Sequence, residues 1–180
     1  MNDLVREYGG ALFELADEEK KADLILGETR AIKGFFGRDT DYARLLSSPT
    51  ITAEERVKIA GEAFDGKVDK FISSFIKMMT ERGYARYIGE CFDEYERRYY
   101  DKNNMSVVTV RSAVELTDAQ KSALIDKLKK RTGKNIELRC SIDPSLIGGI
   151  SVYVDGKLYD GSVSAHIEKV RRSLYGITIN

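Results

Sequence analysis

The residues best suited to ligand chemistry in this sequence lie in the glycine-rich stretch "IDPSLIGGISVYVDGKLYDGS", at 142–162. A phosphate-binding glycine loop leads directly into a helix, because the free N–H groups at the helix N-terminus bind the anion. Here Gly148 and Gly149 lead into an alternating apolar segment that is typical of a strand. Glycine in a strand pattern indicates a bulge or a close approach of two backbones. We therefore predict that this stretch serves the fold and binds no ligand.

The other residue types that support catalysis are sparse. His166 is the only histidine, so several histidines cannot share a metal within one chain, and we predict that it lies on the surface of a helix. No nucleophile-elbow motif accompanies any serine. Cys91 and Cys140 have no cysteine or histidine nearby, and we interpret both as buried, reduced thiols. The carboxylates occur at helical spacing on polar faces. The sequence therefore predicts no catalytic residue, no cofactor and no metal ligand, and hence a protein that is not an enzyme.

Charge and hydropathy argue against nucleic acid and membrane as direct partners. The 29 Lys and Arg residues are balanced by 29 Asp and Glu residues, whereas nucleic-acid-binding proteins carry a basic excess or a basic face. The tyrosines of "YERRYYDK" extend an apolar helix stripe, which favours a core role over base stacking. No segment approaches the roughly 20 apolar residues of a membrane span. The N-terminal segment resembles no leader peptide, so we expect a protein kept in the cytosolic compartment.

The elements that would position any site change character near the middle of the chain. Up to residue 100 the apolar residues recur at three and four, and capping boxes and glycines mark helix ends. The stripes predicted for the first two helices are Leu4, Tyr8, Ala11, Leu12 and Leu15, and then Leu24, Ala31, Ile32, Phe35 and Phe36. After "DKNN", at 101–104, alternation predicts strands, a helix that starts at Thr117, and a hairpin at Asp155-Gly156.

The predicted fold class is α+β. A bundle of about six helices at 1–102 precedes a small mixed α/β domain at 105–180. In the second domain we expect two apolar stripes, one on the half-buried strand "NIELRCSI" and one on the closing helix. They are Ile136, Leu138, Cys140 and Ile142, and then Val163, Ile167, Val170 and Leu174.

One local conflict lies in the first helix, where Gly9 and Gly10 interrupt the pattern "EYGGALFELA". Each glycine in a helix interior costs about 1 kcal/mol relative to alanine. Such a cost is usually retained where another backbone comes close. Two interpretations remain open from the residues alone: a tight contact inside the bundle, or a groove that accepts a helix from a partner protein.

Several segments together resemble a known family. The pattern Tyr-small-small-Ala-Leu-Phe-x-Leu-Ala, here Tyr8 to Ala16, is similar to the start of the delta subunit of F-type ATP synthases, the family of the mitochondrial oligomycin-sensitivity-conferring subunit. "LLSSPTITAEERVKIAGEAF" and "MTERGY" resemble later helices and a turn of that family, although a basic residue is usual where Tyr84 stands. "SAVELTDAQKSAL", "IDPSLIGGISVYV" and "YDGSVSAHIEKVRRSL" match its C-terminal domain in order and spacing.

The resemblance implies a non-catalytic stator component that takes part in proton-driven ATP synthesis. In that family the helical domain caps the catalytic head and receives the N-terminal helix of an alpha subunit, and the C-terminal domain holds the b subunits of the peripheral stalk. The implied location is the cytoplasmic face of a bacterial plasma membrane. The groove for the alpha helix would lie between the first and fifth helices, at Tyr8, Gly10, Ala11, Leu15, Phe75, Met78 and Met79. The alternatives are a small soluble enzyme and a nucleic-acid-binding scaffold.

Overall fold

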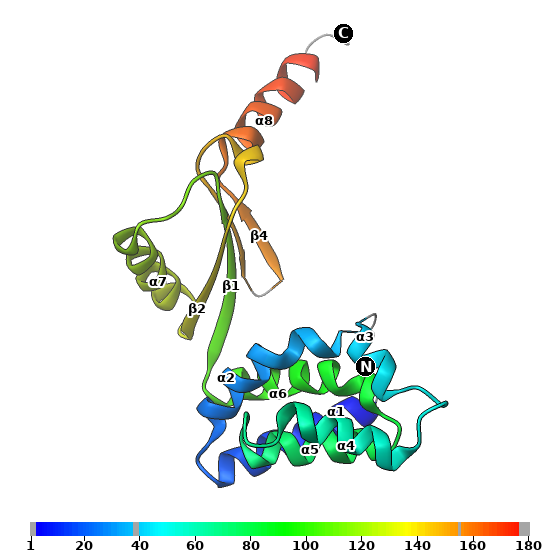
Figure 1. The fold of residues 1–180 in the computed structure, drawn as a ribbon. Coiled ribbons are helices and arrows are strands. Elements are labelled where there is room, and N and C mark those ends of the chain that lie inside the picture. Colours follow the sequence, from blue (N-terminus) through cyan, green and yellow to red (C-terminus); the bar gives the residue numbers. More distant parts are fainter. Residues whose placement is uncertain (1–2, 38–39, 155, 177–180) are drawn as a thin grey trace. The chain divides into compact units, whose positions relative to one another are not determined.

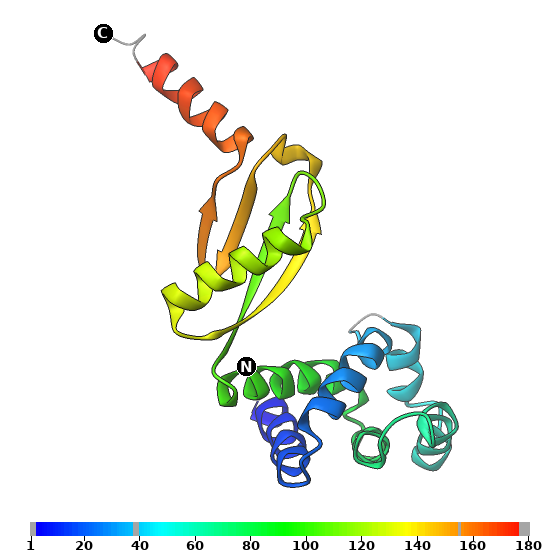
Figure 2. The same ribbon diagram turned by 90° about the vertical axis from the view of Figure 1, so that its left-hand side faces the viewer.

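A series of helices precedes a mixed sheet in the computed structural model, which describes residues 3–37, 40–154 and 156–176 (Figure 1; Figure 2). This is the predicted α+β class, with the helical part first. The chain falls into two units, Met1–Lys102 and Asn103–Asn180. Each unit has its own buried hydrophobic core.

Six α-helices and two short 3-10 turns make up the described part of the N-terminal unit, in agreement with the prediction from apolar spacing. They are α1 (Asp3–Glu18), α2 (Ala22–Ile32), η1 (Lys33–Phe36), α3 (Asp41–Leu46), α4 (Ala53–Phe64), α5 (Lys70–Glu81), η2 (Ala85–Tyr87) and α6 (Ile88–Lys102).

Short polar side chains determine where several of these helices begin. Thr52 accepts a hydrogen bond from the N–H of Glu55 at 3.3 Å, and the Glu55 carboxylate accepts one from the N–H of Thr52 at 3.1 Å, which confirms the predicted capping box of α4. Asp69 begins α5 by accepting from the N–H of Phe71 at 3.0 Å. Its other carboxylate oxygen accepts from Nζ of Lys21 at 2.6 Å, so the α1–α2 turn is tied to the start of α5. The Lys21 ammonium and the Phe71 N–H lower the pKa of the Asp69 carboxyl.

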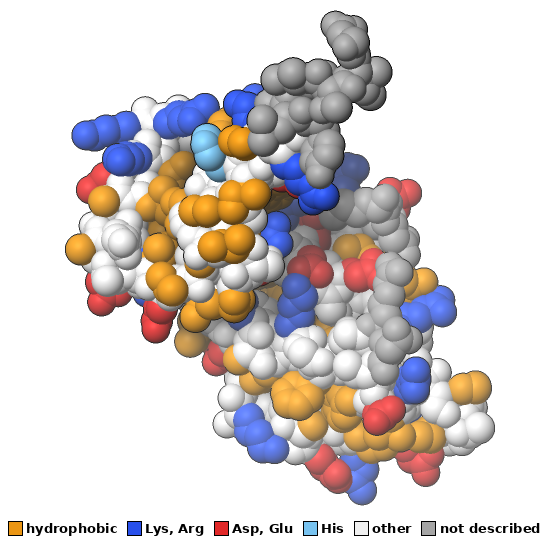
Figure 3. Space-filling view, turned by 90° about the horizontal axis from the view of Figure 1, so that it is seen from above, with side chains coloured by type: hydrophobic (Ala, Val, Ile, Leu, Met, Phe, Trp, Pro, Cys, Tyr) orange, Lys and Arg blue, Asp and Glu red, His pale blue; other side chains and the backbone are white. Residues whose placement is uncertain are grey.

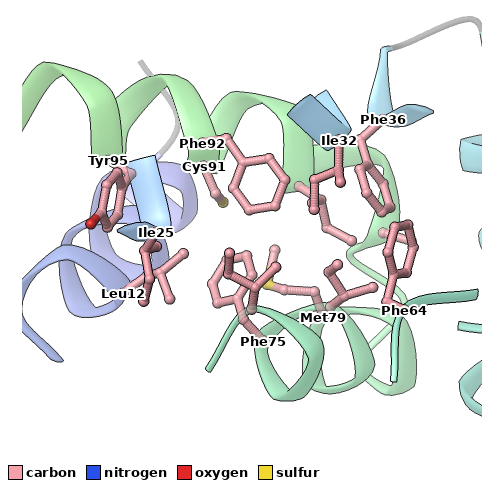
Figure 4. Packing of buried hydrophobic residues seen from close by; sticks show 14 of the residues in the cluster. Leu12, Ile25, Ile32, Phe36, Phe64, Phe75, Met79, Cys91, Phe92 and Tyr95 are labelled. Carbon is pink, nitrogen blue, oxygen red and sulfur yellow. The ribbon is translucent and has the colours of Figure 1, made fainter. Parts of the chain in front are cut away.

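Aromatic side chains form the centre of the bundle, and Figure 4 shows those of α5 and α6 pointing toward one another. Phe36 packs edge-on against Phe92 with ring centroids 5.9 Å apart, and its ring lies 5.6 Å from that of Phe64. Phe75 of α5 lies 6.0 Å from Phe92 of α6. All four rings are buried. Aromatic side chains bury large apolar areas, so this cluster contributes much of the stability of the unit.

The buried faces of α1 and α2 differ from the predicted stripes. Leu24 and Phe35 of the predicted stripe are 51% and 56% exposed, and Leu15, which the resemblance assigns to a partner groove, is 40% exposed. Both helices carry apolar residues on more than one face, so spacing alone could not identify the face that packs. The residues that do pack in the core are Val5, Leu12, Phe13 and Ala16 of α1, and Ile25, Leu26 and Ile32 of α2, followed by Phe36.

The glycine pair of α1 permits a close contact with α6 inside the bundle. A Cβ on Gly9 would lie 2.6 Å from the backbone oxygen of Cys91 and 2.8 Å from Cβ of Glu94. A Cβ on Gly10 would lie 2.4 Å from Cζ of Arg98, whose guanidinium lies across this point of α1. Of the two interpretations left open by the sequence, the structure therefore supports the contact within the bundle.

The C-terminal unit has one helix on a four-stranded sheet and a second helix at its end. Its elements are β1 (Met105–Ser112), α7 (Asp118–Thr132), β2 (Asn135–Ile142), η3 (Pro144–Leu146), β3 (Ile150–Val154), β4 (Lys157–Asp160) and α8 (Val163–Gly176). The strand order is β2-β1-β3-β4. β1 and β2 are parallel, with Val108 opposite Leu138, and the other two pairs are antiparallel. The hairpin predicted at Asp155-Gly156 joins β3 to β4, although Asp155 itself lies outside the described residues.

Coverage by α7 decides which strand residues are buried. Ile136 and Leu138 of β2 pack in a small core with Leu128 of α7. Cys140 and Ile142 have the predicted alternation but are exposed, Ile142 by 59%. The prediction that Cys140 is a buried thiol is therefore wrong. Alternation identifies the face of a strand, and it carries no information on how far a helix covers that face.

The closing helix α8 forms as predicted, and its apolar stripe is half exposed. Val163, Ile167 and Val170 are 43%, 52% and 48% exposed, while the side chain of Leu174 lies outside the described set. Figure 3 shows hydrophobic side chains gathered on the surface beside His166, in pale blue. His166 is exposed, as predicted.

Gly149 occupies a position that only glycine fits. Its φ is +77°, and a Cβ there would lie 2.4 Å from the backbone oxygen of Gly161. Nearby, the N–H of Gly161 donates to the oxygen of Ile150 at 3.0 Å, and the N–H of Val163 donates to the oxygen of Gly148 at 3.0 Å. The glycine-rich stretch therefore brings two backbone segments together, as predicted.

We expect Gly149→Val to destabilise the C-terminal unit by about 3 kcal/mol or more, because it combines left-handed strain with a backbone clash. Hydrogen exchange should show lost protection in β3 and β4 and unchanged protection in α6. Gly133→Asn is the matched control, since Gly133 has a φ of +69° but open space around it, and Asn tolerates that conformation. Equal loss of protection in both variants would contradict the steric explanation.

Candidate functional site

An apolar groove of about 400 Å³ lies between α1 and α5. Its lining residues are Tyr8, Ala11, Leu12 and Leu15 of α1, and Phe71, Ser74, Phe75 and Met78 of α5. None of these eight side chains carries a charge. A surface this apolar is unusual for a site of chemistry and typical of one that binds an apolar helix face.

The same helical spacing on both helices creates the groove. On α1 the lining starts at Tyr8 and continues at the third, fourth and seventh residues after it, and on α5 it starts at Phe71 with the same intervals. Residues at these intervals share one face of a helix. Each wall has a small residue in its middle, Ala11 on α1 and Ser74 on α5, and large side chains at its ends. This arrangement leaves a trough between the two helices.

Cations lie beside the aromatic residue at the end of each wall. The Arg82 guanidinium is 5.7 Å from the centroid of the Tyr8 ring and donates a hydrogen bond to the Tyr8 hydroxyl. The ring of Tyr84 lies 6.2 Å from that of Tyr8. Tyr84, which stands where the family usually has a basic residue, therefore packs beside the groove residue Tyr8. On the other wall, Lys21 lies 5.2 Å from the centroid of Phe71.

The structure brings together five of the seven residues predicted for this groove: Tyr8, Ala11, Leu15, Phe75 and Met78. It places the other two elsewhere. Gly10 faces Arg98 of α6, and Met79 is fully buried in the core. Leu12, Phe71 and Ser74 also line the groove and were missed. The repeated spacing on both helices is the signal that would have identified them.

A buried carboxylate stabilises α1 from the side of α6. Glu94 is fully buried and accepts from Nη2 of Arg97 at 2.6 Å and from Nε of Arg98 at 3.0 Å. Arg98 also donates to Glu14 at 2.9 Å and to the backbone oxygen of Arg6 at 3.2 Å, both on α1. Burial raises the pKa of the Glu94 carboxyl, but the hydrogen bonds from Arg97 and Arg98 outweigh it and lower the pKa below 4.5. α1 is thus anchored on α6 while its other face borders the groove.

We expect this network to make the N-terminal unit less stable as the pH falls into the acid range. The pKa of Glu94 is lower in the folded state than in the unfolded chain, so the unfolded chain binds more protons between the two values. The contribution is complete well above the ordinary glutamate pKa and is lost as the pH falls through the lower folded pKa. Urea midpoints measured from about pH 3 to 7 should fall less steeply on the acid side in Glu94→Gln than in the wild type. Identical acid profiles would contradict this role.

Among the described residues, no group of three His, Cys, Asp or Glu side chains could hold a metal ion. Burial raises the pKa of the Cys91 thiol to about 12, so this thiol stays protonated and is not a nucleophile at neutral pH.

A comparison with protein families decides the identity. The family model described as ATP synthase delta (OSCP) subunit matches residues 4–174. The chain belongs to this family. It is therefore a subunit of the F-type ATP synthase complex, the enzyme assembly that makes ATP.

Relatives within the delta subunit family match nearly the whole chain. An ATP synthase subunit delta of Clostridium botulinum (strain Okra / Type B1) is 32% identical over 171 residues, covering 95% of this chain and 96% of the relative. The ATP synthase subunit delta of Prochlorococcus marinus (strain MIT 9301) is 30% identical, with 97% of each chain covered. In both cases the match includes the groove helices and the C-terminal unit.

A solved structure has the same fold. One chain of the cryo-EM structure of the Toxoplasma gondii mitochondrial ATP synthase hexamer superposes with a TM-score of 0.63 at 15% sequence identity, covering 96% of this chain and 97% of that one. In the part of this delta subunit that the structure describes, no helix is both long and apolar enough to cross a bilayer.

Proposed function

We propose that this delta subunit is the non-catalytic connector between the catalytic head of the ATP synthase and its peripheral stalk. The N-terminal unit, residues 1–102, receives the N-terminal helix of an alpha subunit in the groove between α1 and α5. The C-terminal unit, residues 105–180, holds the distal ends of the b subunits. The protein works as a peripheral component at the cytoplasmic face of a bacterial plasma membrane, without inserting into it.

The uncharged groove is the single observation that carries this proposal. Its eight lining residues present apolar and small side chains on two helices at the same spacing, which suits a third helix laid between them. Met78 adds a flexible thioether that adapts to an imperfect fit. An enzyme site would instead need polar groups converging in the pocket.

The groove is large enough to contribute a substantial share of the affinity. Burying about three large apolar side chains of an incoming helix stabilises the complex by roughly 5–9 kcal/mol before the cost of association. Nanomolar binding needs about 12 kcal/mol. The groove alone therefore falls well short of nanomolar binding, and a tight assembly requires further contacts outside it.

The connector acts mechanically. Torque on the ring of catalytic subunits must be resisted by a stator that is bound to the ring at one end and to the membrane sector at the other. Separate cores in the two units suit this task, because each unit can bind one partner without unfolding the other. The buried Glu94–Arg98 network keeps α1, one wall of the groove, fixed under load.

Two measurements test the proposal. Purified full-length chain should bind a synthetic peptide of the alpha N-terminus, and a low-salt pull-down from membranes of the source cell should recover alpha, beta and b subunits together. Failure of both would overturn the proposal. Turnover of a substrate by the isolated chain, or retention on DNA or RNA with a steep salt dependence, would support the enzyme or nucleic-acid alternatives instead.

A further inference from the structure

The outer strand β4 of the sheet in the C-terminal unit is not covered by a helix. α7 crosses one face of the sheet (Figure 2), and its Leu128 shares a buried core with residues of β1, β2 and β3, whereas all four residues of β4 are exposed. Beside it, a groove of about 440 Å³ opens between α7 and the strands β3 and β4. It is distinct from the groove between α1 and α5.

This second groove has an apolar interior and a basic rim. Its lining residues are Leu124, Lys127, Leu128, Arg131 and Thr132 of α7, and Val152, Val154, Lys157 and Tyr159 of β3 and β4. Three of the nine side chains are cationic and none is acidic. Lys127 and Lys157 form no ion pair with any residue in the described ranges. The groove therefore offers apolar contact in its middle and uncompensated positive charge at its edges.

One of the three cations is held in position. The Arg131 guanidinium lies 4.6 Å from the centroid of the Tyr159 ring, and its Nη2 donates to the Tyr159 hydroxyl at 3.2 Å. An arginine that is already ordered loses less conformational freedom when it binds a carboxylate. Its remaining N–H groups form a fork that suits the two oxygens of that group.

The length of the groove indicates the size of its occupant. The lining part of α7 runs from Leu124 to Thr132, which corresponds to about 12 Å of helix or about two turns. An incoming helix of two turns would place two or three apolar side chains over Val152 and Val154. Its flanking positions would meet the cations.

We propose that this groove binds an amphipathic helix whose apolar face is flanked by Asp and Glu side chains. The inference rests on the proposed function, in which the C-terminal unit holds the stalk, and it assigns the seat of one b subunit's distal helix to the space beside α7. Charge complementarity selects the occupant, because a rim of Lys127, Arg131 and Lys157 repels a basic helix and attracts an acidic one.

The same criterion disfavours a second copy of this chain. The half-exposed helix α8 would be its best candidate, since it has the apolar stripe Val163, Ile167 and Val170. However, α8 carries Lys169, Arg171 and Arg172 against a single acidic residue, Glu168. Its sign matches that of the rim, so self-association through this groove is unfavourable.

The test uses the full-length chain and three probes: the soluble part of the b subunit, a 14-residue peptide with a leucine stripe flanked by Glu, and the same peptide with Lys for Glu. The chain contains no tryptophan, so one Trp in each peptide reports binding by fluorescence. We expect the Glu peptide to bind, more weakly as salt increases, and the Lys peptide to bind at least about tenfold more weakly.

Charge reversal assigns the site. The double variant Lys127→Glu with Arg131→Glu should lower the affinity of the chain for the Glu peptide and for the b subunit by about tenfold or more. The control is Lys129→Glu with Lys130→Glu, which makes the same charge change at exposed positions of α7 outside the groove. The single variant Lys127→Glu leaves the contact between Arg131 and Tyr159 intact, so it should keep the wild-type melting temperature and still weaken binding of the Glu peptide.

The outcomes separate this inference from the proposed function. If the b subunit binds the wild type and every variant equally, the stalk uses another surface and the inference is wrong, while the connector role stands. If the b subunit does not bind the wild type, the stalk half of the proposed function fails, and the Glu peptide still decides the groove. A groove that binds neither peptide, or that binds an oligonucleotide in place of the Glu peptide, overturns the inference.

Discussion

Met78→Asp is expected to lower the affinity for the alpha N-terminal peptide by about two to three orders of magnitude. Met78 lines the groove between α1 and α5, so a bound helix would remove an aspartate at this position from water. Desolvating a carboxylate without a partner costs several kcal/mol. In the free protein the same carboxylate can remain hydrated at the groove surface, so the loss is specific to the complex.

A companion variant keeps this prediction independent of folding. Met78 also packs partly against the core, so its replacement lowers stability to some extent. Ala11→Asp introduces the same charge on the opposite wall, at an exposed position with little packing to lose. Ala31→Asp is the matched control, because Ala31 is an exposed alanine of α2 outside the groove. Peptide titration should show large losses for Met78→Asp and Ala11→Asp only. Unchanged affinity in Ala11→Asp would exclude this groove as the binding site.

Gly9→Ala is expected to destabilise the N-terminal unit by about 2–4 kcal/mol, although alanine is the better helix former by about 1 kcal/mol. The added Cβ would lie 2.6 Å from the backbone oxygen of Cys91, and a backbone atom cannot move aside without shifting all of α6. For a unit of this size the melting temperature should fall by roughly 4–8 °C per kcal/mol.

Two other glycines provide a graded control for this prediction. Gly27 of α2 has nothing within 4 Å of its would-be Cβ, so Gly27→Ala should raise stability by about 1 kcal/mol. Gly10→Ala meets the Arg98 guanidinium, which can move aside only by giving up its hydrogen bonds to Glu14 and the Arg6 oxygen, so its effect should lie between those of the other two variants. Urea unfolding of the three variants should rank them with Gly27→Ala the most stable and Gly9→Ala the least. Gain of stability in Gly9→Ala would show that α1 and α6 are not in close contact.

The parts of the fold that depend on local chemistry could be predicted from the sequence. Thr52 and Thr117 begin helices through capping boxes, and Gly133 ends α7 with a φ of +69°, because these interactions involve residues three or four positions apart. The change from helical to alternating spacing likewise indicated the order of helices and strands. Such signals are contained within single segments.

The parts that depend on packing between segments could not be predicted. Phe35 and Phe36 are adjacent and equally apolar, yet one is 56% exposed and the other 1%, because Phe36 meets Phe64 and Phe92 from distant helices. α1 is apolar on two faces, so its spacing did not reveal that Leu15 borders a groove while Ala16 packs in the core. Five of the seven predicted residues therefore line one groove between α1 and α5, and their role in binding a partner stays a prediction.

The contact between α1 and α6 also has a consequence for biosynthesis. α1 is synthesised before α6, its main partner in the bundle, which is translated only at residues 88–102. At synthesis rates of about 5–20 residues per second, α1 waits roughly 5–20 s before it can dock. During that interval both of its apolar faces are exposed on the nascent chain. Folding of the N-terminal unit therefore cannot be completed before α6 has been synthesised, and until then α1 lacks its main packing partner.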